Sequence, residues 1–186
     1  MFDRKARILI ADNTPLSVLS LLGANGLDWL FVPGAEVWVT DMVREEAVRE
    51  PEPGSDQRHE QRQKLSAWFE RNMDRIQIHH TMEGDEYRKA METWRLAGGP
   101  PNLKPSWANR GETSIFQAMK AIESILKDGQ AVLAIMDDRV GRSTLRGMNL
   151  DMDIMSTESF VVWMDEGFGV QGAETAWQTI KMRAPR

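Results

Sequence analysis

Short apolar segments alternate along this chain with segments of helical periodicity, and this alternation limits the fold more than any other feature. The apolar segments typical of buried strands lie at 7–11, 37–39, 76–78 and 131–136 and around Ile154. Apolar residues at helical spacing lie at about 14–22, 40–49, 59–72, 84–96, 110–127, 139–147, 157–164 and 173–181. This order predicts an α/β fold with a mainly parallel central sheet.

The chain has 186 residues, which suits one domain with a substantial core. The segment 50–108 has the weakest pattern and contains two clear breaks, Pro51–Ser55 and Gly98–Pro101. We therefore predict a single domain over 1–186 with a helical insertion at about 50–108. Trp29–Phe31 are a candidate for one further short strand.

The composition limits the kinds of site that the chain can build. It contains no cysteine and only three histidines, which excludes thiolate metal sites and argues against a histidine-rich zinc site. Its 28 aspartates and glutamates leave a metal site built from oxygen ligands open. The net charge of −5 argues against a large passive nucleic-acid surface, but not against an enzyme that gathers acids around cations.

No apolar stretch approaches the roughly 20 residues that span a bilayer. The first residues are charged and lack the apolar core of a signal peptide. We expect a cytoplasmic protein without membrane contact.

Acidic residues recur where predicted strands end or predicted helices begin. They are Asp12, Glu45, Glu46, Glu112, Asp137 and Asp138. In an open α/β sheet, ligands bind beyond the carboxyl ends of the strands, so we expect these side chains to lie at one edge. Clustered carboxylates repel one another unless a cation lies between them, and Mg²⁺ or Mn²⁺ is the natural partner of oxygen ligands. Since paired metal ions promote displacement at phosphorus, the pattern predicts phosphodiester hydrolysis.

Each of these acids also has a purely structural interpretation. Glu112 stands three residues after Asn109, which is the spacing of a capping box. Asp137 and Asp138 are good N-cap residues for the predicted helix 139–147, whose dipole favours them. Taken singly, these interpretations are at least as strong as a catalytic one, but they leave the shared position of the acids unexplained.

Arginines follow the second pair of aspartates at helical spacing. Arg139, Arg142 and Arg146 either form an exposed helix face or guide a phosphate backbone toward the acids.

Five segments, in this order, resemble the PIN-domain nucleases and are most similar to the VapC-like branch of toxins. They are "ILIADNTPLSVL", "VTDMVREEAV", "RGETSIFQA", "LAIMDDRVGRSTLRGMNL" and "IMSTESFVV". The resemblance covers nearly the whole chain. It implies a Rossmann-like α/β/α sandwich with an acidic pocket that binds Mg²⁺ or Mn²⁺.

The resemblance also assigns residues by their position in the motifs. The four catalytic acids that it implies are Asp12, Glu46, Glu112 and Asp138. It leaves Glu45 open as the alternative to Glu46, and Asp137 as the neighbour or alternative of Asp138 among the metal ligands. Thr14 and Thr157 match supporting hydroxyl positions, and Asn13 stands where a small hydroxyl residue is usual. Arg139 and Arg142 remain the candidates for substrate binding.

The function implied by the resemblance is an endoribonuclease, often the toxin of a toxin–antitoxin pair. The expected partners are an RNA substrate, a small antitoxin protein and a second copy of the chain. The alternative is a catalytically inactive PIN-like module that binds proteins and uses its acids as helix caps.

Overall fold

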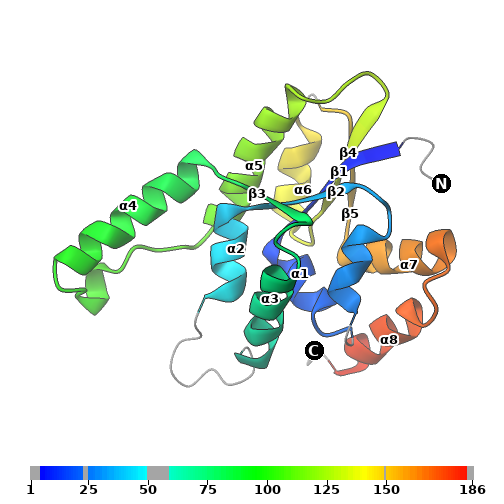
Figure 1. Cartoon of the computed structure of the whole chain (residues 1–186), viewed down its shortest axis with the longest axis horizontal. Helices are drawn as coiled ribbons and strands as arrows, with labels where there is room; N and C mark the ends of the chain where they lie inside the picture. Colours follow the sequence, from blue (N-terminus) through cyan, green and yellow to red (C-terminus); the bar gives the residue numbers. More distant parts are fainter. Residues whose placement is uncertain (1–4, 23–24, 50–58, 149, 184–186) are drawn as a thin grey trace.

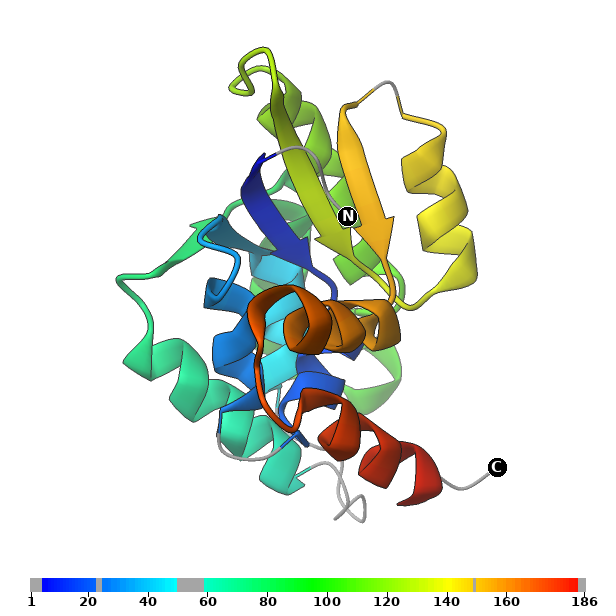
Figure 2. The same cartoon turned by 90° about the vertical axis from the view of Figure 1, so that its right-hand side faces the viewer.

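Strand β1 (Lys5–Ala11) lies at the centre of a five-stranded sheet in the order β3-β2-β1-β4-β5. The other strands are β2 (Glu36–Thr40), β3 (Ile76–His79), β4 (Gln130–Ile135) and β5 (Met152–Met155). All four strand pairs are parallel. The computed structural model describes residues 5–22, 25–49, 59–148 and 150–183. Figure 2 shows β1, β4 and β5 running side by side in one direction.

Helices flank this sheet and make the chain a Rossmann-like α/β/α sandwich, which confirms the predicted fold class (Figure 1). The α-helices are α1 (Asn13–Leu19), α2 (Asp41–Val48), α3 (His59–Arg71), α4 (Met82–Leu96), α5 (Arg110–Glu123), α6 (Arg139–Arg146), α7 (Thr157–Phe168) and α8 (Ala173–Arg183). Two short 3₁₀ helices are η1 (Gly26–Phe31) and η3 (Pro101–Leu103). Of the helices in the described ranges, none combines the length and apolar character that a membrane crossing requires.

The core forms around strands that helices cover on both faces. Residues 8–11 of β1 and 131–135 of β4 are buried without alternation, as is usual for parallel sheets between helices. Helix α5 adds the apolar stripe of Ile115, Met119 and Ile122, which is fully buried. This burial explains why both strands and this helix were predictable as apolar patterns.

Two local predictions are wrong. Trp29–Phe31 belong to the 3₁₀ helix η1, in which Leu27 and Leu30 are buried at the i, i+3 spacing that such a helix brings to one side. The capping box at Asn109 does not form. Asn109 has the left-handed φ of 63° and no side-chain capping bond, whereas an N-cap needs an extended backbone. Thr113 donates its backbone N–H to the carbonyl of Asn109 at 3.1 Å.

The segment 50–108 contains parts of the sandwich. Residues 50–58 lie outside the described ranges. Helix α3 buries Trp68 and Phe69 in the main core, and β3 pairs with β2 at the edge of the sheet. Helix α4 extends away from the body (Figure 1) and buries Tyr87 and Met91 in a second small cluster with Met42.

Candidate functional site

The strand order reverses between β1 and β4. The chain proceeds from β1 to β2 and β3 on one side, and from β4 to β5 on the other. Asp12 follows β1 directly, and Asp137 and Asp138 follow β4 after one residue. The crevice outside such a switch point is the usual ligand site of open α/β sheets.

A cavity of about 750 Å³ lies at this point, and four predicted acids line it. They are Asp12, Glu46, Glu112 and Asp138. Asn13, Thr14 and Trp107 also line its wall. The fold therefore brings to one cavity four carboxylates from four separate segments of the sequence.

The backbone fixes Asp12 beside the end of β4. Its N–H donates to the carbonyl of Ile135 at 3.0 Å, so the hydrogen bonds between β1 and β4 continue one residue beyond the strand. Asp12 occupies the N-cap position of α1, but its carboxylate makes no capping bond. The carboxylate is therefore not used to start the helix.

Helix α2 presents Glu46, and not Glu45, to the cavity. Asn13 donates from Nδ2 to Oε1 of Glu46 at 2.9 Å. A Cβ atom on Gly111 would lie 2.8 Å from Oε2 of Glu46, so the glycine leaves room for this carboxylate. Glu45 is exposed. Burial raises the pKa of Tyr87, and the charge of Glu45 adds to this effect. The arrangement thus separates the two alternatives that the sequence left open.

Glu112 and Asp138 both lie close to the first turn of α6. Asp138 caps this helix by accepting a hydrogen bond from the Gly141 N–H at 2.6 Å, as predicted for an N-cap. A Cβ atom on Gly141 would lie 2.9 Å from Oε1 of Glu112. Asp138 therefore combines a capping bond with a place on the cavity wall.

Asp137 anchors the start of α7. Its two carboxylate oxygens accept hydrogen bonds from the backbone N–H of Thr157 at 2.8 Å and from its hydroxyl at 2.7 Å. Thr157 is fully buried. The hydroxyl predicted to support the site therefore acts on Asp137.

The negative charges of the cluster change the acidity of its members. Burial raises the pKa of Asp12 to about 6, and the charges of Glu46, Glu112 and Asp137 act in the same direction, although a backbone hydrogen bond from Asn13 opposes them. Burial also raises the pKa of Glu112, to which the charge of Asp138 contributes. Burial is therefore the main cause of both shifts, and the neighbouring negative charges add to it.

The chemistry of these donors fits Mg²⁺ or Mn²⁺. Every ionisable donor on the cavity wall is a carboxylate, the ligand type that these cations prefer. Within the described ranges, no three carboxylates or imidazoles lie close enough together to hold one ion directly. Mg²⁺ keeps several water ligands and commonly uses one or two carboxylates, so a roomy acidic cavity suits it.

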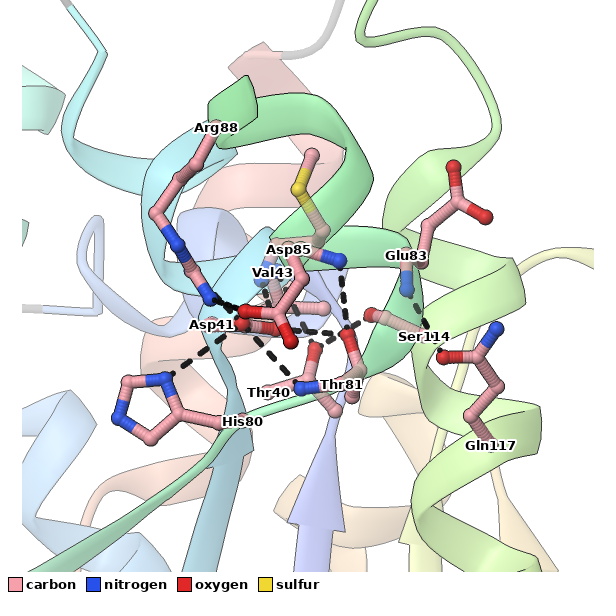
Figure 3. A network of polar contacts seen from close by, with 12 residues as sticks. Thr40, Asp41, Val43, His80, Thr81, Glu83, Asp85, Arg88, Ser114 and Gln117 are labelled. Carbon is pink, nitrogen blue, oxygen red and sulfur yellow. Dashed lines mark hydrogen bonds and ion pairs between the residues drawn. The ribbon is translucent and has the colours of Figure 1, made fainter. Parts of the chain in front are cut away.

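A network of polar contacts holds the helices that carry the acids (Figure 3). Thr40 caps α2 by accepting the Val43 N–H at 3.2 Å, and its Oγ1 lies 2.6 Å from Oγ of Ser114 on α5. Arg110 at the start of α5 pairs with Glu83 at the start of α4. The first contact ties the helix of Glu46 to the helix of Glu112, and the ion pair ties the helix of Glu112 to α4.

Asp41 connects the same network to α4. It accepts hydrogen bonds from Oγ1 of Thr81 at 2.8 Å and from Nη1 of Arg88 at 2.8 Å. Burial acts to raise its pKa, but the hydrogen bonds from Arg88 and Thr81 prevail and lower it. Asp41 is thus an ionised structural acid, outside the cavity.

A second cavity of about 290 Å³ adjoins the acidic one. Asn13, Thr14, Glu46 and Trp107 line both cavities. The remaining wall of the second cavity includes Ser17, Arg49, Gln61 and Arg62. The guanidinium of Arg49 lies 3.8 Å from the ring centroid of Trp107. We name the first cavity the acidic cavity and the second the basic cavity.

The arginines predicted to bind substrate lie elsewhere. Arg139 and Arg142 are on α6 beyond Asp138, and the described residues that line the two cavities do not include them. Sequence reasoning did not find Arg49 or Trp107, because one follows the end of α2 and the other lies in a loop before α5. Only the tertiary fold brings this pair together.

Neither a scan against models of known protein families nor a search of curated proteins finds a match to this chain.

Proposed function

We propose that the protein is a metal-dependent endoribonuclease that hydrolyses RNA phosphodiester bonds. The observation that carries this proposal is the meeting of Asp12, Glu46, Glu112 and Asp138 on one cavity at the switch point of the sheet. The order of the five sequence motifs, which resembles that of PIN-domain nucleases, supports the choice of RNA.

In this proposal Asp12, Glu112 and Asp138 surround Mg²⁺ or Mn²⁺, which one or two of them would bind directly and the others through water, and Asp137 lies beside them. When bound, the cation activates water and offsets negative charge that develops at phosphorus. Asn13 orients Glu46 through its amide, and this carboxylate lines the same cavity as the other three acids. A bound cation would favour the ionised form of Asp12, which burial disfavours.

The biological setting rests on the resemblance alone. By this resemblance we propose that the protein is a toxin that acts in the cytoplasm. Its proposed partners are a small antitoxin protein and a second copy of the chain. The acidic cavity is the part of the surface that such an antitoxin would have to block.

The test is cleavage of a fluorescent single-stranded RNA by the purified protein, with Mn²⁺ and with a chelator. We expect cleavage only with the cation. The variants Asp12→Asn and Glu46→Gln should cleave RNA about 100-fold or more slowly than the wild type. Even groups that merely orient metal ligands change activity by about 10- to 100-fold.

The matched control is Glu45→Gln, which removes the same charge from the preceding residue of α2, outside the cavity. It should keep activity within about twofold, since exposed substitutions away from a site are nearly neutral. Full activity of Asp12→Asn would contradict the proposal. Absence of saturable Mn²⁺ binding in calorimetry, together with no cleavage, would leave the non-catalytic protein-binding module.

A further inference from the structure

The basic cavity differs from its neighbour in the charge of its wall. The acidic cavity is lined by four carboxylates, whereas Arg49 and Arg62 are part of the wall of the basic cavity. The two cavities share Asn13, Thr14, Glu46 and Trp107, so they are two parts of one cleft. The cleft therefore passes from negative to positive within the width of a few side chains.

Arg49 lies over the ring of Trp107. Its guanidinium lies 3.8 Å from the indole centroid, the geometry of a stacked cation–π pair. The N–H groups of a guanidinium lie in its plane, so stacking on a ring leaves them available to an acceptor. Among the described residues, no carboxylate lies within ion-pair distance of Arg49.

Neighbouring polar groups order the rest of the wall. Arg62 donates from Nη1 to the backbone carbonyl of Arg49, and Gln61 donates from Nε2 to the carbonyl of Ser17. These bonds tie α3 to α1 and to the end of α2 around the cavity. The wall is therefore built from fixed cationic, amide and hydroxyl groups with an aromatic edge.

We propose that the basic cavity is the subsite for the RNA nucleotide next to the bond that is cleaved. Arg49 contacts its phosphate, and the stacked pair of Arg49 and Trp107 supports its base. This inference rests on the proposed function and gives it a substrate contact. A nucleotide fits better than an acidic peptide, because it supplies both an anion and a flat ring, and single-stranded RNA is bound by stacking on aromatic rings and guanidinium planes.

The test measures binding separately from cleavage. In the Asp12→Asn background, which keeps the RNA intact, fluorescence anisotropy gives the Kd for a labelled oligoribonucleotide at several salt concentrations. Arg49→Gln should weaken binding about tenfold, the usual effect of losing a charged hydrogen bond. It should also lower the slope of log K against log salt by about 0.7, as expected for one lost contact to a single-stranded phosphate.

Two further variants separate charge from stacking. Trp107→Ala should weaken binding by about 5- to 100-fold, the range for one lost stacking contact, with little change in the salt slope. Arg49→Lys keeps the charge without the planar group, so it should retain the salt slope but bind more weakly than the parent protein. The matched control is Arg44→Gln, also in the α2 segment and also beside an aromatic ring, that of Phe69, but outside both cavities.

The second measurement is the steady-state cleavage of RNA, with the substitution made in protein that keeps Asp12. Arg49→Gln should raise KM for RNA cleavage and leave kcat within about threefold, because the residue binds a group away from the reacting phosphorus. Thermal unfolding of each variant verifies that it is folded.

The outcomes distinguish this inference from the proposed function. Metal-dependent cleavage with equal KM and Kd in Arg49→Gln and Arg44→Gln would overturn the subsite alone. Arg49-dependent RNA binding without cleavage by the wild-type protein would overturn the nuclease and keep the nucleotide site. If Arg49→Gln leaves the Kd for RNA unchanged but weakens binding of an acidic peptide, the cavity binds a protein partner and the inference is wrong.

Discussion

The hydroxyl oxygens of Thr40 and Ser114 lie 2.6 Å apart, and both side chains are fully buried. Thr40 precedes α2, which carries Glu46, and Ser114 lies on α5, two residues after Glu112. This hydrogen bond therefore joins two helices that both line the acidic cavity. Removing it should change the spacing of the acids as well as the stability of the fold.

Ser114→Ala should lower the free energy of unfolding by about 1–2 kcal/mol, because it removes a buried hydrogen bond. It should also weaken Mn²⁺ binding, since the helices of Glu46 and Glu112 lose a direct link. Urea denaturation and calorimetric titration measure the two effects. Ser124→Ala is the control, because this exposed serine also donates to the carbonyl three residues earlier, and the described residues give its hydroxyl no hydrogen bond to a second helix. Equal Mn²⁺ affinity in both variants would contradict the role of Ser114 in spacing the acids.

The pKa of Asp12 predicts how stability depends on pH without divalent cations. Burial raises this pKa from 3.8 to about 6, so the folded state binds more protons than the unfolded state between these values. The contribution of Asp12 to the free energy of unfolding is therefore largest below about pH 4. It falls as the pH rises through about 6, by up to about 3 kcal/mol. Asp12→Asn removes this loss.

Thermal unfolding in a chelator, from pH 4 to pH 7, tests this prediction. The Tm of Asp12→Asn minus that of the wild type should increase as the pH rises, because only the wild type must ionise a buried acid. Added Mn²⁺ should raise the wild-type Tm at pH 7 more than that of the variant. A Tm difference that stays constant with pH would show that Asp12 has an ordinary pKa.

Much of the fold was predictable because its central strands are covered on both faces. The runs 8–11 and 131–136 are continuously apolar for that reason, and their ends place Asp12 and Asp138 at the same edge of any parallel sheet. The choice of Glu46 over Glu45 needed the structure. It depends on the amide of Asn13 and on the space left by Gly111, which belong to other elements.

Other parts of the site had no local signal. A capping box is a pattern of side chains, but the left-handed backbone of Asn109 prevents it, and asparagine tolerates that conformation well. Arg49 and Trp107 meet only because the loop before α5 returns to the end of α2. Neither hydrophobic periodicity nor motif spacing contains that information.

Gly111→Ala should impair the site without weakening the fold. The new Cβ atom would lie 2.8 Å from Oε2 of Glu46, and this flexible carboxylate has to move aside. Alanine is favoured over glycine in a helix by up to about 1 kcal/mol, so the free energy of unfolding should hold or rise. Mn²⁺ affinity and RNA cleavage should both fall.

A double-mutant cycle with Glu46→Ala tests this cause. Once the carboxylate is gone, Gly111→Ala should have no further effect on cleavage or Mn²⁺ binding, because it acts through Glu46. Additive losses would mean that the alanine disturbs another part of the cavity.

Substitutions of the neighbouring aspartates should separate anchoring from metal binding. Asp137→Ala leaves the buried N–H and hydroxyl of Thr157 without their acceptor, so the free energy of unfolding should fall by about 1–3 kcal/mol. Asp138→Asn keeps a good N-cap for α6, since asparagine caps as well as aspartate does, and stability should change by less than about 0.5 kcal/mol. Mn²⁺ affinity should fall in Asp138→Asn and persist in folded Asp137→Ala. Urea denaturation and Mn²⁺ calorimetry below the Tm of each variant measure both quantities, and the opposite pattern of affinities would make Asp137 the ligand.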